Sequence, residues 1–151
     1  MQADRYGVQV DISAKIEAWD KPSMIAVAND HTRVLLVTAE TKQAAARLLA
    51  TGSEPVQYAL MAVLTYLAVR PHLDHLRSIT LDQDYSGEVA ERRVLRRLLL
   101  LLRRDRLRLK SSALRMQNVA GSRADRLARQ AYRGLVQPDG EITLADIEAL
   151  V

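Results

Sequence analysis

The chain has 151 residues and a formal net charge of +4, with 48% hydrophobic and 26% charged residues. This length and composition predict one globular domain over residues 1–151 and exclude a disordered chain. Cysteine is absent, which excludes disulfides, thiolate metal sites and cysteine nucleophiles. The lack of cysteine and of a signal-peptide pattern predicts a cytoplasmic protein. The longest mostly apolar stretch, Tyr58–Val69, is too short to span a bilayer, so we expect no membrane partner.

Basic residues are concentrated in one part of the chain. Residues 88–134 hold 14 of the 22 Arg and Lys residues but only 4 of the 18 Asp and Glu residues. Most of these basic residues are arginines, which bind phosphate oxygens bidentately and stay charged. The asymmetry predicts a polyanion partner, either DNA or RNA, whereas the alternative is that the arginines only solvate helix faces.

The N-terminal third predicts an antiparallel meander of three strands. Residues 6–19 alternate apolar and polar side chains, which is typical of a strand or of a strand that runs into a hairpin. Turn residues at 21–23 and 29–30 separate this segment from two further apolar strands, Met24–Ala28 and Arg33–Thr38.

The rest of the chain predicts alternating helices and strands. Apolar spacing and capping residues predict helices over residues 38–49, 56–69, 88–105, 122–132 and 143–150. Short strands are expected over residues 78–81 and within residues 106–119. Residues 6–134 would therefore form an α/β core, a mixed sheet flanked by helices, and residues 135–151 a C-terminal loop and short helix.

The helix expected over residues 88–105 has an arginine face. At 100° per residue its arginines fall within an arc of roughly 140°, and leucines fill the opposite arc. Leu100 alone points among the arginines, which suggests a homo-oligomer contact. The residues predicted to bind nucleic acid are Arg92, Arg93, Arg96 and Arg97, together with Arg123 from the next helix.

Several aspartates lie on or next to separate predicted elements. Asp11 is on the first strand, on the side opposite its apolar neighbours; Asp82 and Asp84 follow the strand at 78–81; Asp125 is near the start of a helix. Carboxylates that converge from such positions bind Mg²⁺ or Mn²⁺, and two such ions stabilise an in-line phosphodiester displacement. Each aspartate also has a simpler interpretation, as an exposed strand residue, a solvated turn residue or a helix cap.

Three of these stretches resemble motifs of the ribonuclease H superfamily. Residues 10–13 (VDIS) resemble its first-strand aspartate motif, and residues 81–85 (LDQDY) resemble the aspartate at the end of its fourth strand. Residues 118–132 (NVAGSRADRLARQAY) resemble its last motif, in which an aspartate after a glycine-containing loop begins a helix. The family usually supplies a glutamate from the helix after the meander, and Ala59 stands at that position here.

The resemblance implies a ribonuclease H-like fold and a metal-dependent nuclease that uses Mg²⁺ or Mn²⁺. Asp11, Asp82 and Asp125 would be catalytic metal ligands, and Asp84 would be a further ligand. The alternative is a catalytically degenerate module of the same fold that binds nucleic acid or assembles as an oligomer. The three matched aspartates favour the nuclease, and the missing glutamate favours the alternative.

Overall fold

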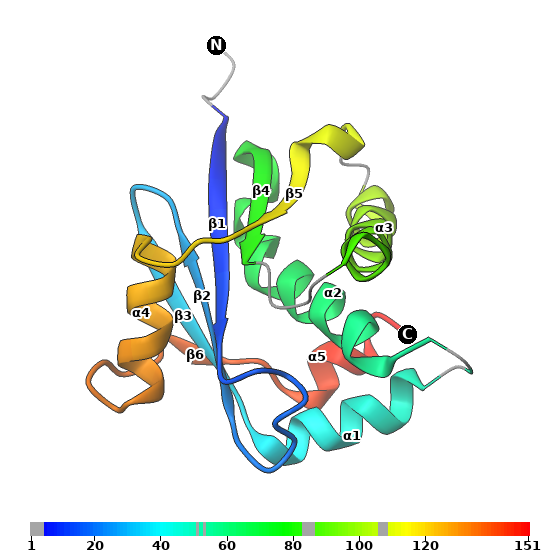
Figure 1. The fold of residues 1–151 in the computed structure, drawn as a ribbon, viewed down its shortest axis with the longest axis vertical. Helices are drawn as coiled ribbons and strands as arrows, with labels where there is room; N and C mark the ends of the chain where they lie inside the picture. The colour runs from blue at the N-terminus through cyan, green and yellow to red at the C-terminus, as the bar shows by residue number, and fades with distance from the viewer. Residues whose placement is uncertain (1–4, 51, 53, 83–86, 106–108) are drawn as a thin grey trace.

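A six-stranded mixed sheet runs through the middle of the molecule, with helices on both of its faces (Figure 1). The computed structural model describes residues 5–50, 52, 54–82, 87–105 and 109–151. The strand order across the sheet is β5-β4-β1-β2-β3-β6. The strands are β1 (Tyr6–Ser13), β2 (Ser23–Ala28), β3 (Thr32–Val37), β4 (Leu76–Asp82), β5 (Leu114–Gln117) and β6 (Gly140–Glu141).

The strand directions confirm the expected mixed sheet. The strands β1, β2 and β3 form an antiparallel meander. In contrast, β4 pairs in parallel with β1, β5 with β4, and β6 with β3. The two-residue strand β6 was not expected from the sequence, because so short a segment carries no alternating pattern.

The first strand ends at Ser13, earlier than the expected limit at residue 19. The following residues turn back, because buried Lys42 donates from Nζ to the Ala18 carbonyl at 2.9 Å and to Ser23 Oγ at 3.0 Å. Ile16 is 1% exposed and therefore enters the core from a turn rather than from a strand. The apolar alternation beyond residue 13 thus reflects burial without strand geometry.

The helices divide between the two faces of the sheet (Figure 1). Helices α2 and α3 cover one face and α4 covers the other, while α1 and α5 pack together beside α2. Two short 3₁₀ segments, Arg70–His75 and Ser111–Ala113, precede β4 and β5. The helices are α1 (Ala39–Leu49), α2 (Val56–Val69), α3 (Glu88–Arg104), α4 (Arg123–Tyr132) and α5 (Leu144–Glu148).

The alternation of β1 side chains creates two separate apolar clusters. Val8, Val10 and Ile12 point into the larger cluster, which includes the buried residues of α2 and α3. On the opposite face, small side chains of β2 and β3 pack against alanines of α4; this cluster comprises Ala26, Ala28, Val34, Ala124, Ala128 and Ala131. Because alanines face alanines, α4 approaches the sheet closely.

No helix in the described part of the chain is long and apolar enough to cross a membrane. The expected α/β class, with a meander and flanking helices, is therefore confirmed at the level of architecture. Residues 83–86 and 106–108, which include Asp84, lie outside the described residues.

Two leucines of α3 test the packing of this helix. Leu98 is fully buried against α2, whereas Leu100 is 54% exposed. We expect Leu98→Ala to lower the free energy of unfolding by about 2–5 kcal/mol, because it leaves a cavity. Leu100→Ala should change it far less, and urea unfolding of both variants at low protein concentration measures the difference. Equal losses would contradict the observed orientation of α3.

Candidate functional site

A buried carboxylate lies on the central strand of the sheet. Asp11 of β1 is 5% exposed, and of the acidic residues that the structure describes only Asp11 is buried. It pairs across the sheet with Ala26, so its side chain faces α4 rather than the larger core. Its Oδ1 accepts a hydrogen bond from the Ile12 amide at 2.9 Å. Burying a carboxyl group is costly unless it has polar partners.

The main side-chain partner of Asp11 is Asp125, in the first turn of α4. The two carboxyl groups share a hydrogen bond. Oδ2 of Asp125 also accepts from the Gly121 amide at 2.9 Å and from Arg129 Nη2 at 2.6 Å. Ser122 Oγ caps α4 by accepting from the Asp125 amide at 3.2 Å. The Asp125 carboxylate therefore joins the strand, the loop and the helix.

Opposing effects act on the pKa of Asp125. Burial raises this pKa, but the hydrogen bonds with Arg129, the Gly121 amide and Asp11 lower it by more. The net shift is therefore downward. The ionised form of the Asp125 carboxyl group is therefore favoured. Two adjacent carboxylates titrate as one unit, because both cannot be ionised without strong repulsion.

Asp82 lies on the strand next to Asp11. In the parallel pairing of β1 with β4, Val10 is opposite Leu81, so the next residues, Asp11 and Asp82, lie on the same side of the sheet. Oδ1 of Asp82 accepts a hydrogen bond from the Val119 amide at 3.2 Å, which ties the loop before α4 to the end of β4.

The structure brings Asp11 and Asp125 into contact and leaves Asp82 one strand away. Within the described residues, no three His, Asp or Glu side chains are grouped closely enough to form a metal site by themselves. Ala59 is 2% exposed inside the core. Glu54, the acidic residue nearest to it in sequence, instead binds Arg97 Nη2 at 2.8 Å.

A polar surface extends from the carboxylate pair across β4 and β5. On this side of the sheet, Gln9, Thr80 and Arg115 form one row across three strands. Asp82 and Gln117 are paired in the next row. The side chains of these five residues are exposed or half-buried, whereas the side chains that alternate with them on β4 and β5 are buried. Polar side chains therefore extend from the carboxylate pair to β5, an edge strand of the sheet.

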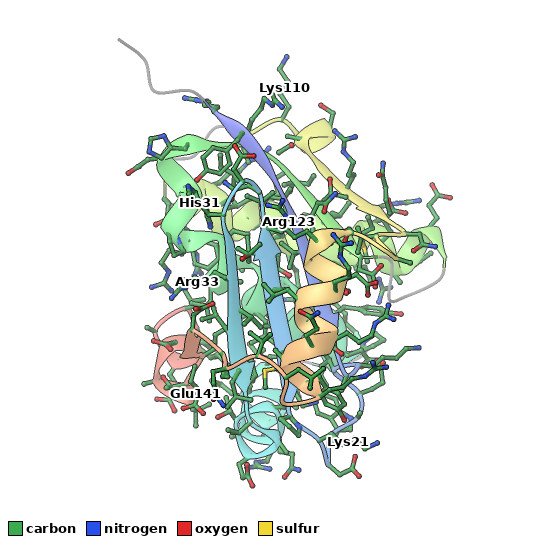
Figure 2. All side chains as sticks on the ribbon, turned by 90° about the vertical axis from the view of Figure 1, so that its left-hand side faces the viewer. Lys21, His31, Arg33, Lys110, Arg123 and Glu141 are labelled. Carbon is green, nitrogen blue, oxygen red and sulfur yellow. The ribbon has the colours of Figure 1, made fainter. Side chains whose placement is uncertain are left out.

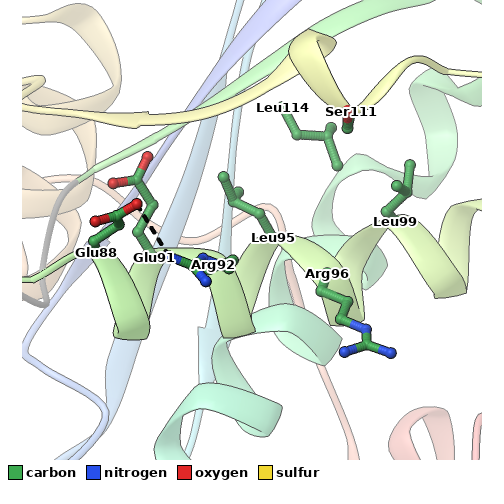
Figure 3. Close-up of a pocket in the computed structure, with 8 residues that line it drawn as sticks. All are labelled: Glu88, Glu91, Arg92, Leu95, Arg96, Leu99, Ser111 and Leu114. Carbon is green, nitrogen blue, oxygen red and sulfur yellow. Dashed lines mark hydrogen bonds and ion pairs between the residues drawn. The ribbon is translucent and has the colours of Figure 1, made fainter.

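The arginines of α3 lie on the other side of the sheet. Two of the four predicted to bind nucleic acid already contact carboxylates: Arg92 Nη2 is 3.0 Å from Glu88, and Arg97 binds Glu54. Arg93 and Arg96 are exposed. Figure 3 shows a groove beside this helix, lined by leucines of α3 and by Leu114 of β5. Contact of these arginines with nucleic acid stays a prediction, and the sheet separates them from the aspartate pair.

Of the arginines of α4, Arg129 lies beside the aspartate pair, whereas Arg123 faces the turn between β2 and β3. Arg123 Nη1 donates to the Asn29 carbonyl at 3.1 Å and to the Asp30 carbonyl at 3.4 Å, in the turn between β2 and β3. Figure 2 shows Arg123 near the upper end of α4 and His31 at the β2–β3 turn. Arg126 and Arg129, which were not singled out from the sequence, are three residues apart on α4 and are therefore neighbours on its surface. Their helical spacing from Arg123 and Asp125 was the available signal.

No family model matches the chain, and no curated protein or solved structure matches it either.

The lowered pKa of Asp125 predicts a pH dependence for its ion pair with Arg129. A depressed pKa stabilises the fold above about pH 4, the ordinary aspartate value, and this contribution is lost as the pH falls through the lowered pKa. Arg129 is 53% exposed, so we expect Arg129→Met to cost at most about 1 kcal/mol at pH 7. Urea unfolding at pH 7 and pH 3 should show the difference shrinking in acid. A difference that stays constant would contradict this assignment.

Proposed function

We propose that this chain is a metal-dependent nuclease with a ribonuclease H-like fold. The observation that carries the proposal is the hydrogen-bonded pair of Asp11 and Asp125 beneath the start of α4. The sheet order supports it, because an antiparallel meander and two parallel strands place Asp11 and Asp82 side by side. These are three of the aspartates expected from the resemblance to that superfamily.

The pair places a buried carboxyl group on a face that is otherwise apolar. The α4 face of the sheet is packed mainly with alanines. A buried ionisable pair usually contributes less stability than apolar packing of the same volume. Carboxylates that lie close together and have perturbed pKa values are typical of functional sites.

The donor set fits Mg²⁺ or Mn²⁺. These cations prefer hard oxygen ligands, and Mg²⁺ is often held by only one or two protein carboxylates plus water and phosphate. Asp11 and Asp125 provide such a pair, and Asp82 lies on the adjacent strand for a further contact. Arg129 is half exposed, so its side chain can move from Asp125 into solvent.

Each element of the site would have a distinct role. Asp11, fixed on the central strand, and Asp125, fixed by its bond from the Gly121 amide, would hold the cation. A cation bound there supplies charge stabilisation to a phosphodiester transition state. Arg129, once displaced, can pair with a neighbouring phosphate.

A second function is supported by a different observation. Arg129 already neutralises Asp125, and Ala59 occupies the position of the family's usual glutamate. Both features suit a non-catalytic module that binds nucleic acid through the same face. The two functions differ in one measurable property, which is metal-dependent cleavage.

The test is a substitution of the buried aspartate. We expect Asp11→Asn to abolish Mg²⁺- or Mn²⁺-dependent cleavage of labelled single-stranded, duplex or hybrid substrates, because it removes a ligand charge at nearly constant size. Binding of the same substrates in EDTA should persist. Asp82→Asn should lower the cleavage rate strongly, and Asp74→Asn, at an exposed position before β4, is the matched control that should cleave normally.

Two results would count against the nuclease. Substrate binding by the wild-type protein with no cleavage in either metal would leave the binding module as the function. Cleavage that persists in Asp11→Asn would place the activity at another site or in a contaminant.

A further inference from the structure

A polar cavity lies on the opposite side of α4 from Asp125. It occupies about 530 Å³ between α4 and the turn that joins β2 to β3. Its walls include Arg123, Arg126 and Gln130 from the helix, and His31 and Thr32 from the turn. None of these residues belongs to the carboxylate pair.

The cavity has hydrogen-bond donors that are already oriented. Arg123 is held by the two carbonyl oxygens of residues 29 and 30, which fixes its guanidinium against the turn. Arg126 is one helical turn further along and exposed, and Gln130 follows at the same face of the helix. Asp30 is the one acidic residue among the described lining residues. Because two arginines also line the cavity, the net charge of its lining is positive.

The cationic lining continues across the turn. His31 and Thr32 also line a neighbouring cavity with Arg33 and His72. There, His72 Nδ1 is 2.7 Å from the Tyr6 hydroxyl, which fixes its ring. Burial lowers the pKa of His72, and the nearby charges of Arg33 and His31 lower it further. Asp139, which lines the neighbouring cavity with Arg33 and His72, accepts a hydrogen bond from the Val34 amide at 2.8 Å.

The position of the cavity relates it to the carboxylate pair. Arg123 and Arg126 flank Asp125 in sequence, but their side chains leave α4 toward the turn, whereas Asp125 faces β1. An α-helix is about 10 Å across, so a strand whose phosphate lies at Asp125 must pass over the width of α4 to reach the cavity.

We infer that the cavity between α4 and the β2–β3 turn binds a backbone phosphate of the same nucleic-acid strand whose scissile phosphate lies at Asp11 and Asp125. The inference rests on the proposed function and assigns the path of its substrate, over α4 toward the turn. Arg126 and Arg123 hold the phosphate oxygens, and His31 and Thr32 bound the site. The ligand class is a phosphodiester backbone without base specificity, because the lining offers charge and donors rather than aromatic faces.

The experiment compares charge reversals at three places on the surface. Binding of a labelled oligonucleotide in EDTA is measured over a series of salt concentrations for Arg126→Glu, Arg93→Glu on α3 and Arg47→Glu on α1. We expect Arg126→Glu to weaken binding about tenfold or more and to reduce the salt slope by about one, as loss of one phosphate contact does. Arg47→Glu carries the same charge change on a distant helix and should bind within about twofold of wild type.

The outcomes separate this inference from the proposed nuclease. If the Arg126→Glu variant binds as tightly as the Arg47→Glu variant, and cleavage still depends on Asp11, the phosphate site is overturned. The proposed nuclease is then left intact. A loss of binding in Arg93→Glu but not in Arg126→Glu would place the path on α3 and also overturn the inference. A wild-type protein that neither binds nor cleaves any substrate would overturn both. Circular dichroism of each variant confirms that the fold is retained.

Discussion

The position of Asp11 on β1 is the constraint on which the proposed site depends. The central strand must send alternate side chains to opposite faces, so the apolar residues that anchor it to α2 and α3 place Asp11 against α4. A one-residue shift in register would bury this carboxylate in the larger core. Asp125 and the Gly121 amide then fix where the loop before α4 crosses the sheet. The strand register, the helix start and the carboxylate pair are therefore one structural unit.

Much of the fold could be predicted from the sequence, because periodicity and caps are local signals. The helix at residues 56–69 has the expected bounds, and that at 88–104 ends one residue earlier than expected. The alternation over residues 6–19 left open a single strand or a strand that runs into a hairpin, and the structure shows the second. The strand ends at Ser13, and Ile16 is buried from a turn that Lys42 contacts through the Ala18 carbonyl. The short β6 forms only because β3 offers an open edge, a property of the assembled sheet.

The site could be predicted only in part, for a related reason. The resemblance of three short motifs indicated Asp11, Asp82 and Asp125, but no local pattern shows which helix covers which face of a sheet. The sequence therefore did not show that the sheet lies between the arginine face of α3 and the aspartates. Arg129 contacts Asp125 and Arg126 lines a cavity because of where α4 lies on the sheet. A helical pattern alone does not show this position.

The central claim is that Asp11 and Asp125 form a cation site rather than a structural pair. The most direct measurement is a crystal structure of the protein soaked in Mn²⁺, with anomalous diffraction recorded to locate the ion. The account predicts an anomalous peak about 2.1–2.2 Å from one oxygen of each carboxylate, with Arg129 displaced from Asp125. The account would be contradicted if an ordered site at saturating Mn²⁺ showed no anomalous peak. In that case the Asp11–Asp125 hydrogen bond and the ion pair of Arg129 with Asp125 would both be intact.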